Sequence, residues 1–248
     1  MTAVSDTGQP RAYLSWVLAA NAGFVDAAGY VALVRLFTAH QSGNTAGLGV
    51  ALGAGDWTDA WRRGVSILAF VVGVGVGTAL VEINNRRRPR RSAAALAAVQ
   101  MLVLGLALAV GEDVSVHGRL DPAQTGAYVA AAAALAGAMG LQTVGLRRIG
   151  GRSVRTTFVT GLLTNAAENF VVGLGTRREG GRRRLLSASA LLGSVWVFYL
   201  AGGVAGGVAQ AAWSFAALGV PLAVTAGVAA LDLKAPYLPD LPAPGRQR

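Results

Sequence analysis

The chain has 248 residues, of which 53% are hydrophobic and 14% charged, and its formal net charge at pH 7 is +10. About a quarter of the residues in a water-soluble domain are charged, so this composition, with a mean hydropathy of +0.49, indicates a membrane protein. The absence of cysteine excludes disulfides, thiol catalysis and cysteine-bound metals. The basic residues form short clusters between apolar runs, which argues against nucleic acid as a partner.

Residues 1–11 form a short polar segment, which we expect to be a cytoplasmic tail before a retained first span. A helix crosses the hydrocarbon core with about 20 mostly apolar residues, and open strand edges do not occur there. The apolar runs predict an all-α polytopic membrane protein of about six spanning helices, at residues 13–36, 64–83, 92–111, 123–146, 186–211 and 214–232. The membrane domain then covers residues 12–232, and the proline-rich segment 233–248 is a second tail.

Two further apolar segments, 41–55 and 156–175, carry polar residues in their interior and are predicted to be re-entrant or broken helices. The loops 84–91, 146–155 and 176–184 hold five, four and five arginines, and such loops face the cytoplasm. If segment 156–175 spanned the membrane, one of these loops would lie outside. The same reasoning places both termini in the bacterial cytoplasm and lets segment 41–55 enter from the outer side. Four basic residues do not fit this pattern: Arg35, Arg62, Arg63 and Arg119.

The two halves of the chain resemble each other weakly, which predicts an internal repeat. Each half, about 12–111 and 123–232, has the order span, re-entrant segment, span, span. Three spans reverse the direction of the chain, so the copies are expected to be inverted repeats, a plan in which transporters hold sites near the midplane at interrupted helices. The corresponding positions are Asp26 and Gln142, Gly29 and Gly145, Ser42 and Thr160, and Gly43 and Gly161.

The polar residues of the two re-entrant segments form the predicted site. Gly43 and Gly161 are expected to supply bends or close approach, and the hydroxyl residue before each glycine suits an N-cap of a half-helix. Asn44 and Asn165 either face a solute or tie helices together by hydrogen bonds. The candidate solute-binding residues are Asp26, Gln41, Ser42, Gly43, Asn44, Thr45, Gln142, Thr160, Gly161, Thr164, Asn165 and Glu168.

Asp26 lies near the centre of the first span, where a carboxylate is energetically expensive and a functional candidate. Asn21 is nearly opposite on the same helix and need not share the same pore. Glu168 either belongs to a polar stripe or forms a surface salt bridge with Arg155 or Arg177. The two histidines lack clustered carboxylates, and no nucleophile–base–acid set is visible, so we predict no metal, no cofactor and no enzyme.

The stretches GFVDAAGYVALVRLFTAHQSGNT (23–45) and RTTFVTGLLTN (155–165) resemble the signatures of the YoaK family of bacterial inner-membrane proteins. The similarity covers roughly residues 12 to 232. It implies a six-or-seven-helix protein of the inner membrane and supplies no established substrate. The positions that match the family's motifs are Asp26, Ser42, Gly43, Asn44, Thr160, Gly161, Thr164, Asn165 and Glu168.

These observations favour a small-solute transporter or channel in which two half-helix tips meet near the midplane. Asn44 and Asn165 would coordinate the solute, and Asp26 would be a proton or cation site. The alternative is a non-transporting membrane scaffold that binds lipid or a partner through its arginine-rich cytoplasmic face. The expected partners are the lipid bilayer and an unknown small solute, not nucleic acid, and a homo-oligomer is left open.

Overall fold

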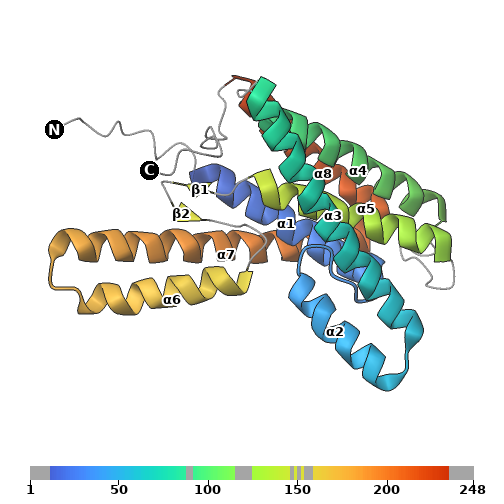
Figure 1. Cartoon of the computed structure of the whole chain (residues 1–248), viewed down its shortest axis with the longest axis horizontal. Coiled ribbons are helices and arrows are strands. Elements are labelled where there is room, and N and C mark those ends of the chain that lie inside the picture. Colours follow the sequence, from blue (N-terminus) through green and yellow to red (C-terminus); the bar gives the residue numbers. More distant parts are fainter. Residues whose placement is uncertain are drawn as a thin grey trace.

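In the computed structural model the protein is a bundle of α-helices (Figure 1). The structure describes residues 12–87, 92–114, 125–145, 148–149, 152–153 and 159–234. The predicted N-terminal tail, nearly all of the C-terminal tail and much of the arginine-rich loops 84–91 and 146–155 lie outside these residues. The prediction of an all-α protein is confirmed for the described part of the chain, apart from one pair of two-residue strands.

The helices follow one another along the chain with short connections. They are α1 (Ala12–Ala32), α2 (Gln41–Ala54), α3 (Trp57–Arg87), α4 (Ser92–Val114), α5 (Thr125–Gly145), α6 (Val159–Gly175), α7 (Glu179–Trp213), the 3-10 helix η3 (Ser214–Leu218) and α8 (Gly219–Lys234). Between α5 and α6, two-residue strands β1 (Arg148–Ile149) and β2 (Arg152–Ser153) pair in antiparallel fashion.

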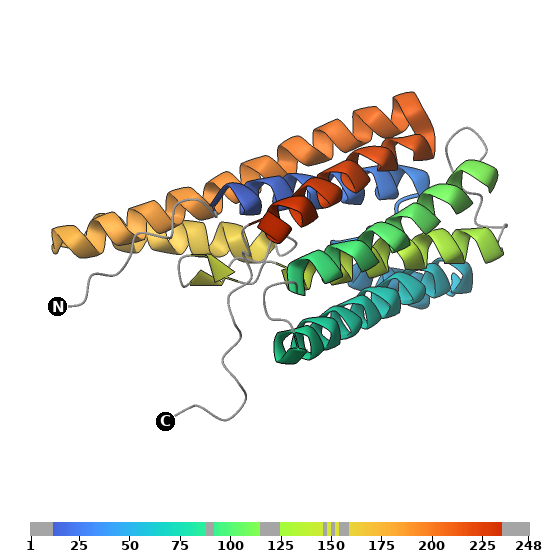
Figure 2. The same ribbon diagram turned by 90° about the horizontal axis from the view of Figure 1, so that it is seen from above.

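Each of the six predicted spans is helical over most of its length. Among the described residues, four helical segments are long and apolar enough to cross a membrane: Trp57–Asn84, Ala93–Gly111, Gly126–Gly145 and Glu179–Lys234. The last of these contains both α7 and α8. The chain turns back at Ser214, whose φ is 51°, and α8 then packs mainly on α4. Figure 2 shows α7 and α8 diverging from this turn.

Helix α1 is not among these four segments because it is more polar. Its side chains Ser15, Asn21 and Asp26 are only 0%, 3% and 3% exposed. The helix lies in the interior, packed against α7 and also touching α5 and α8 (Figures 1 and 2). A polar side chain in the membrane is tolerated where it faces protein rather than lipid, so α1 is the helix on which buried polar contacts are expected.

The predicted re-entrant segments form α2, of 14 residues, and α6, of 17 residues. At a rise of about 1.5 Å per residue they are about 21 and 26 Å long, shorter than the hydrocarbon core of about 30 Å. Neither helix is broken, and the predicted bends at Gly43 and Gly161 are wrong, since both glycines lie within the first turn of a continuous helix. Before α2, the chain instead reverses at Val34 and Arg35, whose φ angles are 51° and 65°.

The two short helices each form a hairpin with the long helix that follows. Helix α2 packs on the first half of α3, and α6 packs on the first half of α7, where the Ser189 hydroxyl donates a hydrogen bond of 2.7 Å to the Ala166 carbonyl oxygen. The α2–α3 and α6–α7 hairpins point away from each other, one toward the lower right and the other toward the left of Figure 1.

The second half of α7 crosses α1 with the two backbones in direct contact. A Cβ atom added to Gly202 would collide with the carbonyl oxygen of Ala20, and one added to Gly23 would collide with that of Tyr199. Farther along, Gly206 meets Phe24 in the same way. Trp16 of α1 contacts Ser194 of α7, and Phe24, two turns later in α1, meets Gly206 later in α7, so α1 and α7 run parallel. Small residues permit this close approach, as is typical of helix pairs in membranes.

Helices α3 and α5 cross in the same manner. A Cβ atom on Gly73 would collide with the carbonyl oxygen of Gly137, and one on Gly140 would collide with that of Phe70. The residues in contact at the two crossings correspond. Adding 117 to positions 20 and 23 of α1 gives positions 137 and 140 of α5. Adding 129 to positions 70 and 73 of α3 gives positions 199 and 202 of α7. The fold thus contains one backbone crossing twice.

Candidate functional site

The segment between α1 and α2, residues 33–40, is called the corner. A buried arginine holds it in place. The Nη2 atom of Arg62 donates to the carbonyl oxygens of Leu33 and Val34 at 2.8 and 2.9 Å, where the left-handed turn leaves helix α1. Its guanidinium lies over the ring of Tyr128, 4.6 Å from the centroid, and Nη1 is 3.6 Å from a carboxylate oxygen of Asp59. These contacts give Arg62 a local structural role. They explain why this basic residue lies outside the predicted cytoplasmic loops.

The carboxylate of Asp26 binds the backbone of the same corner. Its Oδ1 atom accepts hydrogen bonds from the backbone N–H groups of Thr38 and Ala39, both at 2.7 Å, and from the Thr38 hydroxyl at 3.2 Å. The His40 N–H lies at 3.4 Å, and the Tyr199 hydroxyl of α7 donates to Oδ2 at 2.6 Å. Asp26 therefore places its negative charge at the N-terminus of α2, which the helix dipole favours.

Asn44 fastens the first turn of α2 to the corner and to α3. Its Oδ1 atom accepts the Phe37 N–H at 3.1 Å, while Nδ2 lies 2.7 Å from the Phe37 carbonyl oxygen, 2.9 Å from Gln41 Oε1 and 3.0 Å from Ser66 Oγ. Asn44 is 0% exposed. Of the two roles predicted for this amide, the contacts are those of a group that ties helices together.

The neighbouring candidates complete the corner in less buried positions. The predicted N-cap role of Ser42 is wrong, because the N-cap of α2 is His40 and Ser42 lies inside the helix. The exposed Ser42 hydroxyl instead lies 3.2 Å from His40 Nε2, and the exposed Thr45 hydroxyl donates to the Gln41 carbonyl oxygen at 2.8 Å. Gly43 leaves room for the rings of His40 and Phe37, since a Cβ atom there would be 3.3 and 3.0 Å from them.

The candidates on α6 lie elsewhere. Thr160, Thr164, Asn165 and Glu168 are exposed, whereas Gly161 is buried. The Thr164 hydroxyl donates to the Thr160 carbonyl oxygen at 3.0 Å, one turn earlier in the same helix, so Thr160 is inside α6 and is not its N-cap. The hydrogen-bond partners of Asn44 are Phe37, Gln41 and Ser66, and none of them lies on α6. The α2–α3 and α6–α7 hairpins diverge (Figure 1), and the meeting of the two tips in one pocket stays a prediction.

A second polar cluster lies in the interior of the bundle. The Asn21 Nδ2 atom of α1 donates to Gln142 Oε1 of α5 at 2.7 Å, and the Gln100 Nε2 atom of α4 donates to the same oxygen at 2.9 Å. Gln142 Nε2 donates to the Leu18 carbonyl oxygen at 2.8 Å. The three amides are 3%, 4% and 2% exposed, in the order Asn21, Gln100, Gln142. We call these three side chains the amide cluster.

One atom of the amide cluster has no partner. Asn21 Oδ1 is buried and accepts no hydrogen bond from the described residues. Leaving a buried polar group without a hydrogen bond costs about 1–3 kcal/mol. Among the described buried side chains Arg62 Nε is also without a partner, and such an atom marks a place for an ordered water, an ion or a ligand.

A small cavity adjoins the amide cluster. Its volume is about 20 Å³, and about 10–15 Å³ is enough to hold one water molecule. Helices α1, α4, α5 and α8 enclose it. The lining residues are Leu18, Ala93, Leu96, Ala97, Gln100, Gln142, Gly145, Thr225 and Val228.

The buried carboxylate of Asp232 joins α8 to α4 close to this cavity. Its Oδ2 atom accepts the Ala94 N–H at 3.0 Å, at the N-terminus of α4, next to the lining residue Ala93. Asp232 is 1% exposed. Within the described ranges, no group of three or more His, Asp and Glu side chains is arranged to hold a metal ion.

The family model described as a protein of unknown function (DUF1275) matches residues 14–231 of this chain. The chain belongs to this family. It is also 23% identical, over 212 residues, to the UPF0700 transmembrane protein YoaK of Bacillus subtilis (strain 168), an alignment that covers 86% of this chain and 89% of that relative. No solved structure matches the chain. The resemblance to the YoaK family is confirmed, and the transmembrane relative together with the apolar helices supports a membrane location.

The sequence of this DUF1275 chain predicts Gln142 as a site residue but not the residues that it contacts. Asn21 is expected apart from the predicted pore, and Gln100 and Asp232 are not among the candidates that the sequence indicates. A polar residue within an apolar run was the available signal, since Gln100 follows AAALAAV and precedes MLVLGLA. Which of the intramembrane polar residues meet depends on how the helices rotate against each other, and periodicity in these nearly uniform apolar helices does not specify that.

Proposed function

We propose that this chain is a transporter or channel for a small solute in the bacterial inner membrane, with the amide cluster as its binding site. The proposal is carried by the buried, incompletely paired amides beside a cavity at the contact of α1, α4 and α5. Polar side chains at such depth are expensive in a membrane and usually mark a solute pathway or a helix contact. A contact needing only helix adhesion would not require an acceptor without a donor.

The repeated crossing supports this proposal because it fits two inverted repeats. Helices α1 and α7 run parallel, as do α3 and α5, and each crossing pairs one helix from each half of the chain. In transporters built from inverted repeats, the site lies where the repeats meet, and the amide cluster joins α1 and α4 of the first half to α5 of the second. The shift of 117 positions places Thr143 opposite Asp26, one residue from the sequence-based match with Gln142.

The proposed site is closed in this conformation. The cavity has room for about one water molecule. The corner bound by Asp26 joins α1, α2 and α7, and the contact between Asp232 and Ala94 joins α8 and α4. Passage of a solute would require helices around the amide cluster to separate, first toward one side of the membrane and then toward the other.

Flux into proteoliposomes tests the proposal. Purified protein is reconstituted, and uptake of labelled small solutes, both charged and uncharged, is compared with protein-free liposomes. The Gln142→Leu variant removes the side chain that joins the cluster and is expected to abolish the flux. Asn169→Leu, on the distant helix α6, is the matched amide-to-leucine control and is expected to behave as wild type. Saturation of the flux would indicate a transporter, and a linear dependence on concentration would indicate a channel.

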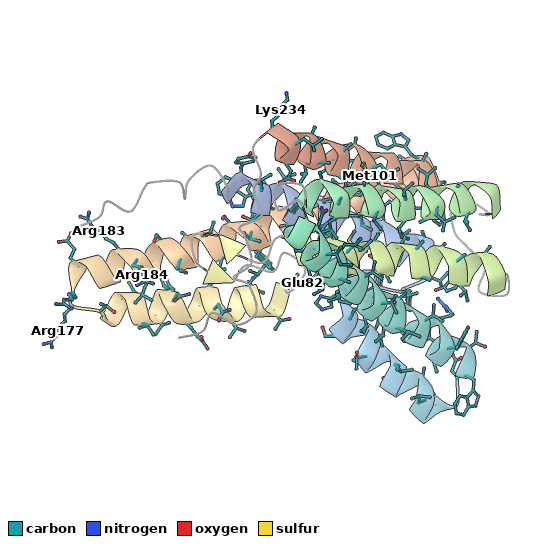
Figure 3. All side chains as sticks on the ribbon, turned by 45° about the horizontal axis from the view of Figure 1, so that its top comes forward. Glu82, Met101, Arg177, Arg183, Arg184 and Lys234 are labelled. Carbon is teal, nitrogen blue, oxygen red and sulfur yellow. The ribbon has the colours of Figure 1, made fainter. Side chains whose placement is uncertain are left out.

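A second candidate function, the membrane scaffold, is favoured by one surface. The turn between α6 and α7 carries Arg177, Arg178, Arg182, Arg183 and Arg184, all exposed, at the far end of the hairpin (Figure 3). The scaffold hypothesis predicts that replacing Arg178 and Arg182 by glutamine abolishes activity in cells, whereas Gln142→Leu does not. The transport proposal predicts the reverse.

A further inference from the structure

We infer that the solute of the amide cluster is uncharged and both donates hydrogen bonds to the protein and accepts them from it. This inference rests on the proposed function and adds the chemical class of the solute. It follows from what the walls of the cavity contain, from which hydrogen-bonding atoms are already used, and from the size of the space.

The walls provide no charge. The residues that line the cavity are apolar side chains, one glycine, the amides of Gln100 and Gln142, and the hydroxyl of Thr225. An ion moved from water into such surroundings would lose several kcal/mol or more of solvation, unless an opposite charge were present to offset it. Asp232, the nearest carboxylate described above, is not one of the lining residues and binds the Ala94 N–H. The lining therefore selects against ions of either sign.

Both acceptor and donor atoms remain. Gln142 uses Oε1 for two donors and Nε2 for the Leu18 carbonyl oxygen, and Asn21 uses Nδ2 for Gln142. The hydroxyl hydrogen of Thr225 is directed to the Pro221 carbonyl oxygen at 2.7 Å, which leaves only lone pairs on its oxygen. Asn21 Oδ1 accepts nothing from the described residues. Asn21 is not one of the lining residues, and it adjoins the cavity through its hydrogen bond to the lining residue Gln142. Each amide NH2 group of the cluster has two N–H donors and uses one of them in these bonds. A solute with both N–H or O–H groups and an acceptor oxygen complements these atoms, whereas a solute with acceptors alone leaves Asn21 Oδ1 unpaired.

The space limits the solute to a few heavy atoms. The cavity of about 20 Å³ holds a water molecule, so a larger solute must take the place of contacts within the cluster. The bond of 2.7 Å between Asn21 and Gln142 is the contact to replace, because a planar amide-like solute can donate to Asn21 Oδ1 while accepting from Nδ2.

Pairs of probes with nearly the same shape separate charge from hydrogen bonding. Uptake of urea and of guanidinium, the two planar probes, is measured in the same proteoliposomes, and acetamide is compared with N,N-dimethylacetamide, which has no donor. We expect flux of urea and acetamide above that of protein-free liposomes, and none of guanidinium or N,N-dimethylacetamide. Asn21→Leu should lower urea flux about tenfold, equivalent to one buried hydrogen bond of about 1.4 kcal/mol, and Asn169→Leu should leave it unchanged.

The outcomes are distinguishable. If guanidinium is transported in an Asn21-dependent manner and urea is not, the transport proposal stands and the inference on solute class is wrong. If no charged or uncharged probe crosses, the proposed function is itself wrong, and the cavity holds a structural water only. If urea crosses equally in wild type and Asn21→Leu, the site lies elsewhere. Should Asn21→Leu fail to fold, Asn21→Asp, of nearly the same shape, replaces it and is expected to exclude urea and admit guanidinium.

Discussion

The segments HQSGNT (40–45) and VTGLLTN (159–165) are similar in sequence but occupy different surroundings. Asn44 is 0% exposed and bonds to the corner backbone and to Ser66 of α3. Asn165 is exposed on α6. Asp26 of α1 binds the N-terminus of α2, whereas the position related to it by the backbone crossings is Thr143, whose hydroxyl donates to the Met139 carbonyl oxygen of its own helix at 2.8 Å.

The two halves of the chain therefore share the backbone contacts at the helix crossings and differ in their polar side-chain contacts. The α1–α7 and α3–α5 crossings have glycine at corresponding positions, because two backbones in direct contact leave almost no room for a side chain. Hydrogen-bonded side chains are not constrained in this way, since a helix N-terminus can be stabilised by a carboxylate, an amide or water. The first half of the chain therefore contains a buried structural corner, whereas α6 of the second half presents its polar residues at the surface.

Removing the Asp26 carboxylate should have the largest effect on stability. Asp26→Ala leaves the buried N–H groups of Thr38 and Ala39 without their acceptor, at about 1–3 kcal/mol for each group, so we expect the free energy of unfolding to fall by about 4 kcal/mol. Asp26→Asn keeps one acceptor oxygen and should cost less than half of that. Thermal unfolding in detergent, followed by tryptophan fluorescence, measures both.

The same two variants separate a structural role of Asp26 from the proton or cation site expected from the sequence. If Asp26→Asn is as stable as wild type and loses proton-coupled uptake, Asp26 belongs to the transport mechanism. Loss of stability in proportion to loss of uptake would leave it as the anchor of the corner.

A methyl group at the repeated crossing should have the next largest effect. Gly202→Ala and Gly73→Ala would force the backbones of two helices apart, at about 1–3 kcal/mol each, as for other overpacked interiors. Gly207→Ala and Gly75→Ala are matched controls, because a Cβ atom at either position has no neighbour within 4 Å. Equal thermal stability in the two pairs would contradict the crossing described here.

Truncation of Asn44 and Asn165 should have the smallest effects on the free energy of unfolding. It directly tests whether the two asparagines have different surroundings. Asn44→Ala leaves the Phe37 N–H without its acceptor, so it should lower the free energy of unfolding by about 2 kcal/mol. Asn165→Ala changes an exposed side chain and should stay within about 0.5 kcal/mol of wild type. A similar loss in both variants, measured by the same thermal unfolding, would show that Asn165 is buried in the membrane-embedded protein and would restore the shared pocket.

Much of the architecture was determined by the sequence alone. Length and composition of the apolar runs predicted the helices, because a chain in lipid must satisfy its backbone hydrogen bonds internally. The short segments 41–55 and 156–175 were recognised as different from full spans, and the signatures around them identified the family. Gln142 was found as a candidate because an amide within an apolar run is conspicuous.

Only the tertiary structure decided which polar residues meet. Asn21, Asn44 and Asn165 are the same residue type in similar apolar surroundings, yet one is incompletely paired in the interior, one is fully bonded at a corner and one is exposed. The burial of a side chain depends on the rotation of its helix against neighbours that are distant in the chain. Glycine crossings set those rotations through contacts between backbones, and the sequence of one helix does not state which other helix it will touch.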